Sequence, residues 1–239
     1  MNNPNSAPLP ITTLTQFEQD EIQRGFIVRV YAWMAFGLFV TAAASVVTLF
    51  TPGLLMLITT NTMLFFGLLM AEFIVVIVLT AAINRLVPAV AGLAFVFYAA
   101  LNGVTLSIMM LIYTASSIAE TFVIAAATFG AMTLFGLTTH RDLTKLGSLL
   151  IMGLFGLILA TVFNLFFQST AVYWITTYAG ILIFIGLIAY DTQKLKNMSL
   201  AVGVEGEVSQ KASILGALAL YLDFINLFLL LLRIFGRRK

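Results

Sequence analysis

Seven long apolar runs follow one another along this chain, and they constrain its fold more than any other feature. Each is close to the roughly 20 residues that a helix needs to cross the ~30 Å hydrocarbon core of a bilayer. The runs lack the two-residue alternation of barrel strands, and a helix satisfies its own backbone hydrogen bonds in lipid. The runs are Ile27–Phe50, Met63–Ile83, Val87–Tyr113, Ile118–Thr138, Leu146–Phe167, Tyr173–Tyr190 and Ile214–Leu232.

Composition points to the same class, because 61% of the residues are apolar and only 9% are charged. A soluble domain of this length could not cover so much apolar surface. We therefore predict an all-α integral membrane protein in which residues 26–239 form a seven-helix transmembrane domain. Residues 1–25 are polar and are predicted to form a disordered cytoplasmic tail. The net charge of +2 comes mostly from basic residues near the membrane faces, so no nucleic-acid partner is expected.

The distribution of lysine and arginine predicts the orientation, since basic loops stay on the cytoplasmic side. Three of the loops carry no basic residue. The amino-terminal region and the loops on its side carry Arg24, Arg29, Arg85, Arg141, Lys145, Lys194, Lys196 and Lys211. The amino terminus is therefore predicted to be cytoplasmic. The last four basic residues lie outside if the seventh run spans and inside if it folds back, and the sequence leaves both open.

Three carboxylates lie in apolar surroundings where a charge costs several kcal/mol unless it is paired, protonated or open to water. Asp191 ends the sixth run, Asp223 lies in the middle of the seventh, and Glu72 lies in the middle of the second. Arg85 is about 20 Å along the helix axis from Glu72, which excludes a direct pair within that helix. Asp142, by contrast, fits the start of the fifth helix, where a carboxylate accepts from free backbone amides.

Asp191 and Asp223 could meet only if the seventh helix is displaced or the sixth extends further than its apolar run. Two touching carboxyls in a low-dielectric site are expected to share one proton near neutral pH. Such a pair is a two-state element, because the shared proton ties two helices together and its loss drives them apart. The ionised pair would offer hard oxygen ligands suited to Ca²⁺. A proton-gated cation path follows as a hypothesis.

Four blocks of sequence resemble the Bax inhibitor family, also called the transmembrane Bax inhibitor motif proteins. The short loops and the Thr-x-Arg-Asp-Leu turn are similar to those of bacterial members. The blocks occur in the family's order and are FVFYAALNGVTLS (Phe95–Ser107), FGAMTLFGLTTHRDL (Phe129–Leu143), IAYDTQKL (Ile188–Leu195) and LALYLDFINLF (Leu218–Phe228).

The resemblance implies a seven-helix fold whose last helix is central and surrounded by the other six. It also implies a pH-sensitive Ca²⁺ leak, with Asp191 and Asp223 as the gating pair that transiently binds Ca²⁺. Glu72 matches the family's acidic residue on the second helix, and Arg85 looks like the base that engages the ionised pair. A bacterial inner-membrane location, Ca²⁺ and protons as transported species, no resident cofactor and no enzymatic activity are therefore expected.

Two other functions compete with the channel hypothesis. Intramembrane aspartyl proteases also use two aspartates, but this chain has Leu-Tyr-Leu-Asp where that family has Gly-x-Gly-Asp, and no proline follows Pro88. A non-conducting regulator of a membrane protease or a stress response is the stronger alternative, with the polar tail as a handle for the partner. Gly153 and Gly156 allow close helix approach, which fits either a monomer or a weak oligomer.

Overall fold

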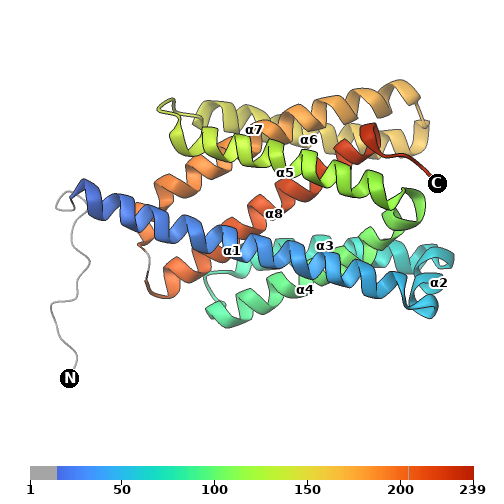
Figure 1. Ribbon diagram of the computed structural model, residues 1–239, viewed down its shortest axis with the longest axis horizontal. Coiled ribbons are helices and arrows are strands. Elements are labelled where there is room, and N and C mark those ends of the chain that lie inside the picture. The colour runs from blue at the N-terminus through green and yellow to red at the C-terminus, as the bar shows by residue number, and fades with distance from the viewer. Residues whose placement is uncertain (1–14, 204) are drawn as a thin grey trace.

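The computed structural model describes residues 15–203 and 205–239, which form a bundle of long antiparallel helices (Figure 1). Seven of the helices in these residues are long and apolar enough to cross a membrane, and the short α2 joins α1 to α3 at one end. The predicted all-α fold with seven spanning helices is thus confirmed. The helices are α1 (Gln16–Leu49), α2 (Pro52–Thr60), α3 (Thr62–Ala82), α4 (Pro88–Ile112), α5 (Ala115–Thr138), α6 (Thr144–Phe167), α7 (Thr170–Val202) and α8 (Glu207–Phe235).

Helix α1 begins well before its apolar run because its first turn is capped. The backbone N–H of Glu18 donates to the Thr15 hydroxyl over 3.3 Å, and the Thr15 N–H donates to the Glu18 carboxylate over 2.7 Å. This reciprocal pair is a capping box, which satisfies backbone donors at a helix start. Residues 16–25 are therefore helical rather than part of the predicted tail. The rest of that tail, residues 1–14, lies outside the described residues.

Helix α7 continues to Val202, well past the predicted end of the sixth run at Tyr190. Beyond that point Thr192, Leu195 and Ser199 are buried, and their spacing of three to four residues gives the polar segment one inward face. The helix stops at Gly203, whose φ of 68° suits a residue without a side chain. Most of the polar stretch between the sixth and seventh apolar runs is therefore helical.

Helix α8 is the most buried of the spanning helices. Within its most apolar stretch 72% of the residues are buried, against at most 33% in any other spanning helix of the described chain. It packs against α1, α4, α5 and α7, while α3 packs mainly on α4 and α6 mainly on α7. The last helix thus supplies the core, but a complete ring of six helices around it is not confirmed.

The end of the chain is fastened to the turn between α4 and α5. The Thr114 N–H donates to the Arg237 carbonyl and the Lys239 N–H to the Ile112 carbonyl, each over 2.9 Å. This turn lies at the opposite end of the bundle from the start of α1 (Figure 1). The seventh run therefore crosses the whole bundle and does not fold back, which decides the question that the sequence left open.

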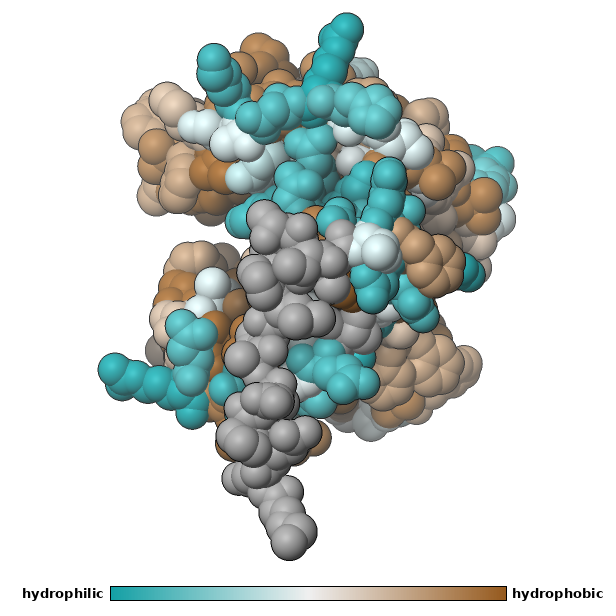
Figure 2. All heavy atoms as spheres, turned by 90° about the vertical axis from the view of Figure 1, so that its left-hand side faces the viewer, coloured by the Kyte–Doolittle hydropathy of each residue, from teal (hydrophilic) through white to brown (hydrophobic). Residues whose placement is uncertain are grey.

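The outer surface of the bundle suits a bilayer. Large apolar side chains such as Phe39 on α1, Phe73 on α3, and Leu159 and Phe166 on α6 are more than half exposed. Figure 2 shows the end of the bundle where α1 begins, with hydrophilic side chains gathered on that end and apolar ones along the flanks. This distribution places the helix sides in lipid and the end in contact with water.

Candidate functional site

Asp191 and Asp223 are brought together by the antiparallel packing of α7 and α8. Asp191 lies about 17 Å along the axis from the end of α7, and Asp223 about 24 Å from the start of α8. The two residues therefore reach similar depths, and their carboxyl groups are close enough to interact electrostatically with each other. The extension of α7 past Tyr190 makes this possible, which is one of the two conditions that the sequence had left open.

The Asp223 carboxyl is buried without a full set of partners. Asp223 is 5% exposed, and its Oδ2 atom has no hydrogen-bond donor within the described residues. Two ionised carboxylates can only accept, so a hydrogen bond between Asp191 and Asp223 requires a proton on one of them. A buried polar atom left without a partner costs about 1–3 kcal/mol, and folded proteins keep few of them. Such an atom marks a candidate functional site.

Aromatic rings join α8 to α5 at Phe224, the residue that follows Asp223. The ring of Phe224 meets those of Phe122 and Phe129 edge to face, with centroid distances of 5.4 and 5.6 Å. Both partner rings belong to α5. Beyond Asp223, toward its carboxyl-terminal end, α8 therefore packs on α5 through apolar rings.

A cavity of about 360 Å³ approaches the pair from the other direction. It lies among the end of α3, the extended part of α7 and the first half of α8. Its polar lining consists of Asn84, Asp191, Lys194 and Lys211, and the remaining lining is largely apolar. Asp191 can therefore be reached from the end of the bundle where α1 begins, whereas Asp223 lies behind it.

Glu72 lies apart from the aspartates and has neutral partners. Its side chain is buried on α3 and accepts from the Thr105 hydroxyl over 2.8 Å and from the Asn102 amide over 3.4 Å. Both donors lie one turn apart on α4. The sequence offered protonation, a base or a water-filled cavity as explanations for Glu72, and the structure instead gives it two polar side chains of the neighbouring helix.

Comparison with known proteins identifies the family. The family described as "Inhibitor of apoptosis-promoting Bax1" matches residues 23–239. The chain belongs to the Bax inhibitor family. It is 47% identical to the Escherichia coli K12 protein named "Inner membrane protein YbhL" over 90% of this chain and 92% of that protein. It is also similar to proteins named only as uncharacterized from Borreliella burgdorferi, with 40% identity over 95% and 98% of the two chains, and Rickettsia prowazekii, with 42% identity over 92% of each.

The basic residue that the resemblance assigns to the Bax inhibitor pair lies elsewhere in this structure. Arg85 follows the end of α3, where Ile83 and Asn84 line the cavity but Arg85 does not. It takes part in neither of the two ion pairs found within residues 15–203 and 205–239. Lys194, one turn beyond Asp191 on α7, is the base whose charge acts on that carboxyl. The structure thus brings the two aspartates together but not Arg85.

A polar network that sequence reasoning missed runs from Glu72 to α8. The Tyr221 hydroxyl donates to the side-chain Oδ1 of Asn102 over 3.3 Å and lies 2.7 Å from the Thr41 hydroxyl. Asn102 in turn donates to Glu72. Four helices of this Bax inhibitor family member are therefore joined by one chain of side-chain hydrogen bonds. The chain of bonds reaches α8 at Tyr221, two residues before Asp223. The signal in the sequence was the pair of polar residues one turn apart in an apolar run.

The carboxylates do not form a closed metal site. Within the described residues no group of three or more His, Cys, Asp or Glu side chains could hold a metal ion. Ca²⁺ takes six to eight oxygen ligands, so two aspartates would need carbonyl groups and water to complete its coordination. This donor set suits brief contact with a passing ion better than a resident one.

Proposed function

We propose that this protein is a pH-sensitive path for Ca²⁺ across the bacterial inner membrane, gated by Asp191 and Asp223 sharing a proton. One observation carries the proposal, namely the buried Oδ2 of Asp223, which has no donor among residues 15–203 and 205–239 and belongs to a carboxyl that interacts with a second one. The cavity that ends at Asp191 supplies the route by which protons and ions reach the pair.

In the protonated state one carboxyl donates to the other, and this bond ties α7 to α8 near the middle of the bundle. The aromatic rings around Phe224 then close the path on the far side. A hydrogen bond to a charged group contributes about 1.5–3 kcal/mol, which is enough to bias the position of two packed helices.

Loss of the proton leaves two negative charges that repel each other. Two unit charges about 4 Å apart interact by roughly 4 kcal/mol at an effective dielectric constant of about 20. The positive charge of Lys194 offsets part of this repulsion at Asp191. The ionised pair attracts a divalent cation and favours separation of α7 from α8. Glu72 is a third buried carboxyl group, separate from the aspartate pair, and it accepts hydrogen bonds from Asn102 and Thr105.

The location, orientation and class of activity are part of the same proposal. A relative is named an inner membrane protein, which supports that membrane for this chain. Eight of the twelve basic residues belong to the end where α1 begins, which supports a cytoplasmic amino terminus. We propose no enzymatic role, because the segment before Asp223 lacks the Gly-x-Gly-Asp motif of intramembrane aspartyl proteases.

The test is Ca²⁺ flux into dye-loaded proteoliposomes between about pH 5 and pH 9, a range into which burial can raise the pKa of a carboxyl group. The variants are Asp191→Asn and Asp223→Asn, which keep the side-chain size and remove the shared proton. Asp142→Asn is the matched control, because that carboxyl is exposed in the turn before α6. Wild type and the control should show the same pH-dependent flux, and either pair variant should flatten the profile.

Wild-type flux equal to that of empty liposomes at every pH would overturn conduction. Regulation of a membrane protease or a stress response would then become the leading function. Pair variants that keep the wild-type profile would leave conduction standing but remove the aspartates as its gate.

A further inference from the structure

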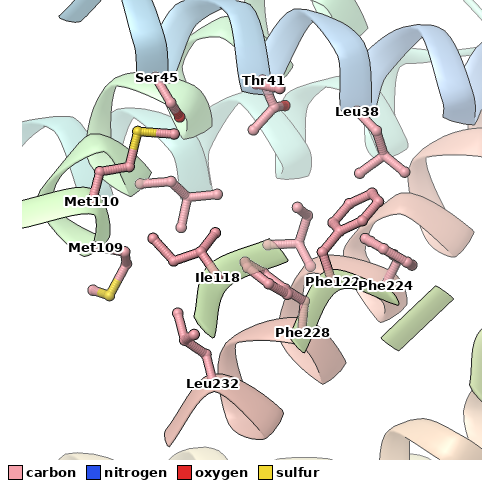
Figure 3. A pocket seen from close by; sticks show the side chains of 13 residues that line it. Leu38, Thr41, Ser45, Met109, Met110, Ile118, Phe122, Phe224, Phe228 and Leu232 are labelled. Atoms are coloured by element: carbon pink, nitrogen blue, oxygen red, sulfur yellow. The ribbon is translucent and has the colours of Figure 1, made fainter. Parts of the chain in front are cut away.

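A second cavity, of about 120 Å³, lies on the opposite side of Asp223 from the first and is lined by α1, α4, α5 and α8 (Figure 3). Its walls are almost entirely apolar. They consist of Leu38, Thr41, Ala42, Ser45, Leu106, Met109, Met110, Ile118, Phe122, Phe224, Ile225, Phe228 and Leu232. The two hydroxyls in this set already bond to carbonyl oxygens, Thr41 to that of Ala99 and Ser45 to that of Gly103. They offer no unpaired group to water or an ion.

The cavity opens sideways between α1 and α5. Ala42 of α1 is exposed, and Phe122 of α5 is 44% exposed, yet both contribute to its lining. Phe122 lies about 10 Å along α5 from its first residue, and thus inside the hydrocarbon region. Apolar cavities of this size stay dry and accept apolar ligands. At this depth the apolar solute present in bulk is the lipid acyl chain.

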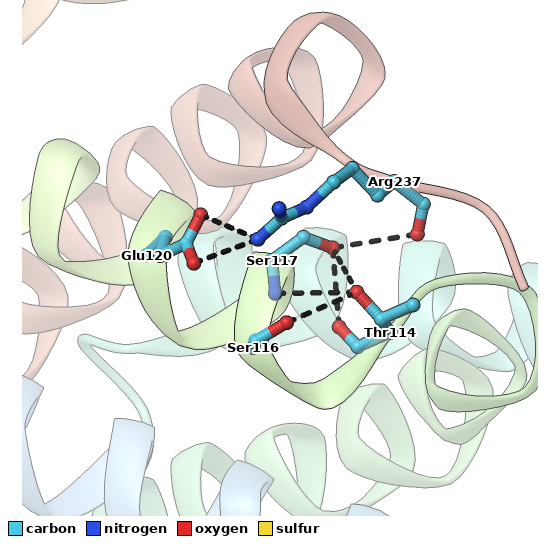
Figure 4. Close-up of polar contacts among 5 residues, drawn as sticks. All are labelled: Thr114, Ser116, Ser117, Glu120 and Arg237. Atoms are coloured by element: carbon cyan, nitrogen blue, oxygen red, sulfur yellow. Dashed lines mark hydrogen bonds and ion pairs between the residues drawn. The ribbon is translucent and has the colours of Figure 1, made fainter.

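Basic side chains lie just beyond one end of the same cavity. Lys239 donates from its ammonium group to the carbonyl of Met110, a lining residue, over 2.7 Å. Arg237 is occupied by Glu120, with guanidinium to carboxylate distances of 2.8 and 3.1 Å (Figure 4). Arg238 is exposed, and its guanidinium makes no hydrogen bond or ion pair with a side chain of residues 15–203 and 205–239. Lys239 and Arg238 are therefore available to a phosphate at the membrane surface.

We propose that this cavity and the two last basic residues, Arg238 and Lys239, together bind one anionic phospholipid. Its acyl chain lies between α1 and α5, and its phosphate lies at Arg238 and Lys239. The backbone bonds from 237–239 to the α4–α5 turn hold these two side chains at the end of the groove. The lipid belongs to the leaflet at the carboxyl-terminal end of α8. This site is separate from the aspartate pair, and its test does not depend on ion conduction.

The experiment measures lipid retention by native mass spectrometry of the purified full chain with equal phosphatidylglycerol and phosphatidylcholine. Wild type should retain phosphatidylglycerol preferentially. Each basic side chain near a membrane surface strengthens anionic lipid binding about fivefold, so Arg238→Gln with Lys239→Gln should reduce the preference by about 30-fold. Ala42→Phe should block the groove, whereas Ala43→Phe should not, because Ala43 is exposed beside it and does not line the cavity.

Equal retention of the two lipids by wild type would overturn the headgroup site. If the Ala42→Phe variant retains as much lipid as the Ala43→Phe variant, the cavity is not the binding site of the acyl chain. If Ala42→Phe fails to fold, Ala42→Leu fills less space at the same position and tests the groove in its place. The tail variants change side chains outside the helices, so their result stands independently.

Discussion

The hydrogen bonds of Tyr221 should contribute measurably to the stability of the bundle, and Tyr221→Phe isolates them. The substitution removes the hydroxyl but keeps the ring, which packs edge to face on Phe95 and Tyr98 at centroid distances of 5.8 and 5.7 Å. Two contacts are lost, to Thr41 and Asn102. Side-chain hydrogen bonds between membrane helices average about 0.6 kcal/mol each, with a maximum of about 1.7. We therefore expect a loss of about 1–2 kcal/mol in the free energy of unfolding.

The assay is reversible unfolding in mixed detergent micelles, followed by circular dichroism as the denaturing detergent is increased. Tyr178→Phe is the matched control, because Tyr178 is 55% exposed on α7 and its hydroxyl has no hydrogen bond within the described residues. A double-mutant cycle with Thr41→Val should give a coupling of about 0.5 kcal/mol or more for residues in one network. If Tyr221→Phe costs no more than Tyr178→Phe, the network does not stabilise the fold and the reasoning fails.

Two further predictions concern packing and the turn before α6. Gly103→Ala should lower the free energy of unfolding by about 1–3 kcal/mol, because the added Cβ would collide with the backbone carbonyl of Thr41. Gly156→Ala is the control, since Gly156 faces open space and the substitution should be neutral or slightly stabilising. Thermal unfolding measures both. Hydrogen bonds from the side chain and the backbone N–H of Thr144 hold the pKa of the exposed Asp142 carboxyl below its ordinary value. The ionised Asp142 carboxylate stabilises α6 fully at pH values above its pKa in the unfolded chain. This stabilisation is lost as the pH falls through the lower pKa of the folded protein. An NMR titration of the Asp142 carboxyl carbon should therefore show a midpoint below that of free aspartate.

The spanning helices could be predicted from the sequence because the hydrocarbon core imposes a length and lipid imposes helical hydrogen bonding. The first, sixth and seventh runs were predicted too short, since apolar length was used to set their ends. The capping box at Thr15 and Glu18 and the buried spacing of Thr192, Leu195 and Ser199 were both legible in the sequence. The predicted role of Asp142 at the start of α6 is confirmed: this residue lies just before the helix, and its carboxylate accepts from the Thr144 N–H over 2.9 Å.

The contacts between helices could not be predicted in the same way. Lipid tails are as apolar as leucine, so the buried and lipid-facing sides of a spanning helix carry the same residue types. The sequence could single out Asp191, Asp223 and Glu72 as unusual, but it could not show which helix faces each of them. Tyr221 could not be singled out for the same reason. An aromatic residue is common in an apolar run, and the sequence does not show which side chains bind its hydroxyl.

The burial of α8 has a consequence for how the protein is made. The ribosome synthesises this helix last, so α1 to α7 must enter the membrane before the segment that supplies most of their shared interior exists. Until then the inner faces of α1, α4, α5 and α7 meet lipid or one another, and Asp191 lacks its counterpart. A chain that stops short of residue 207 therefore presents unfinished surfaces to quality-control proteases, whereas completion of the last helix closes them in one step.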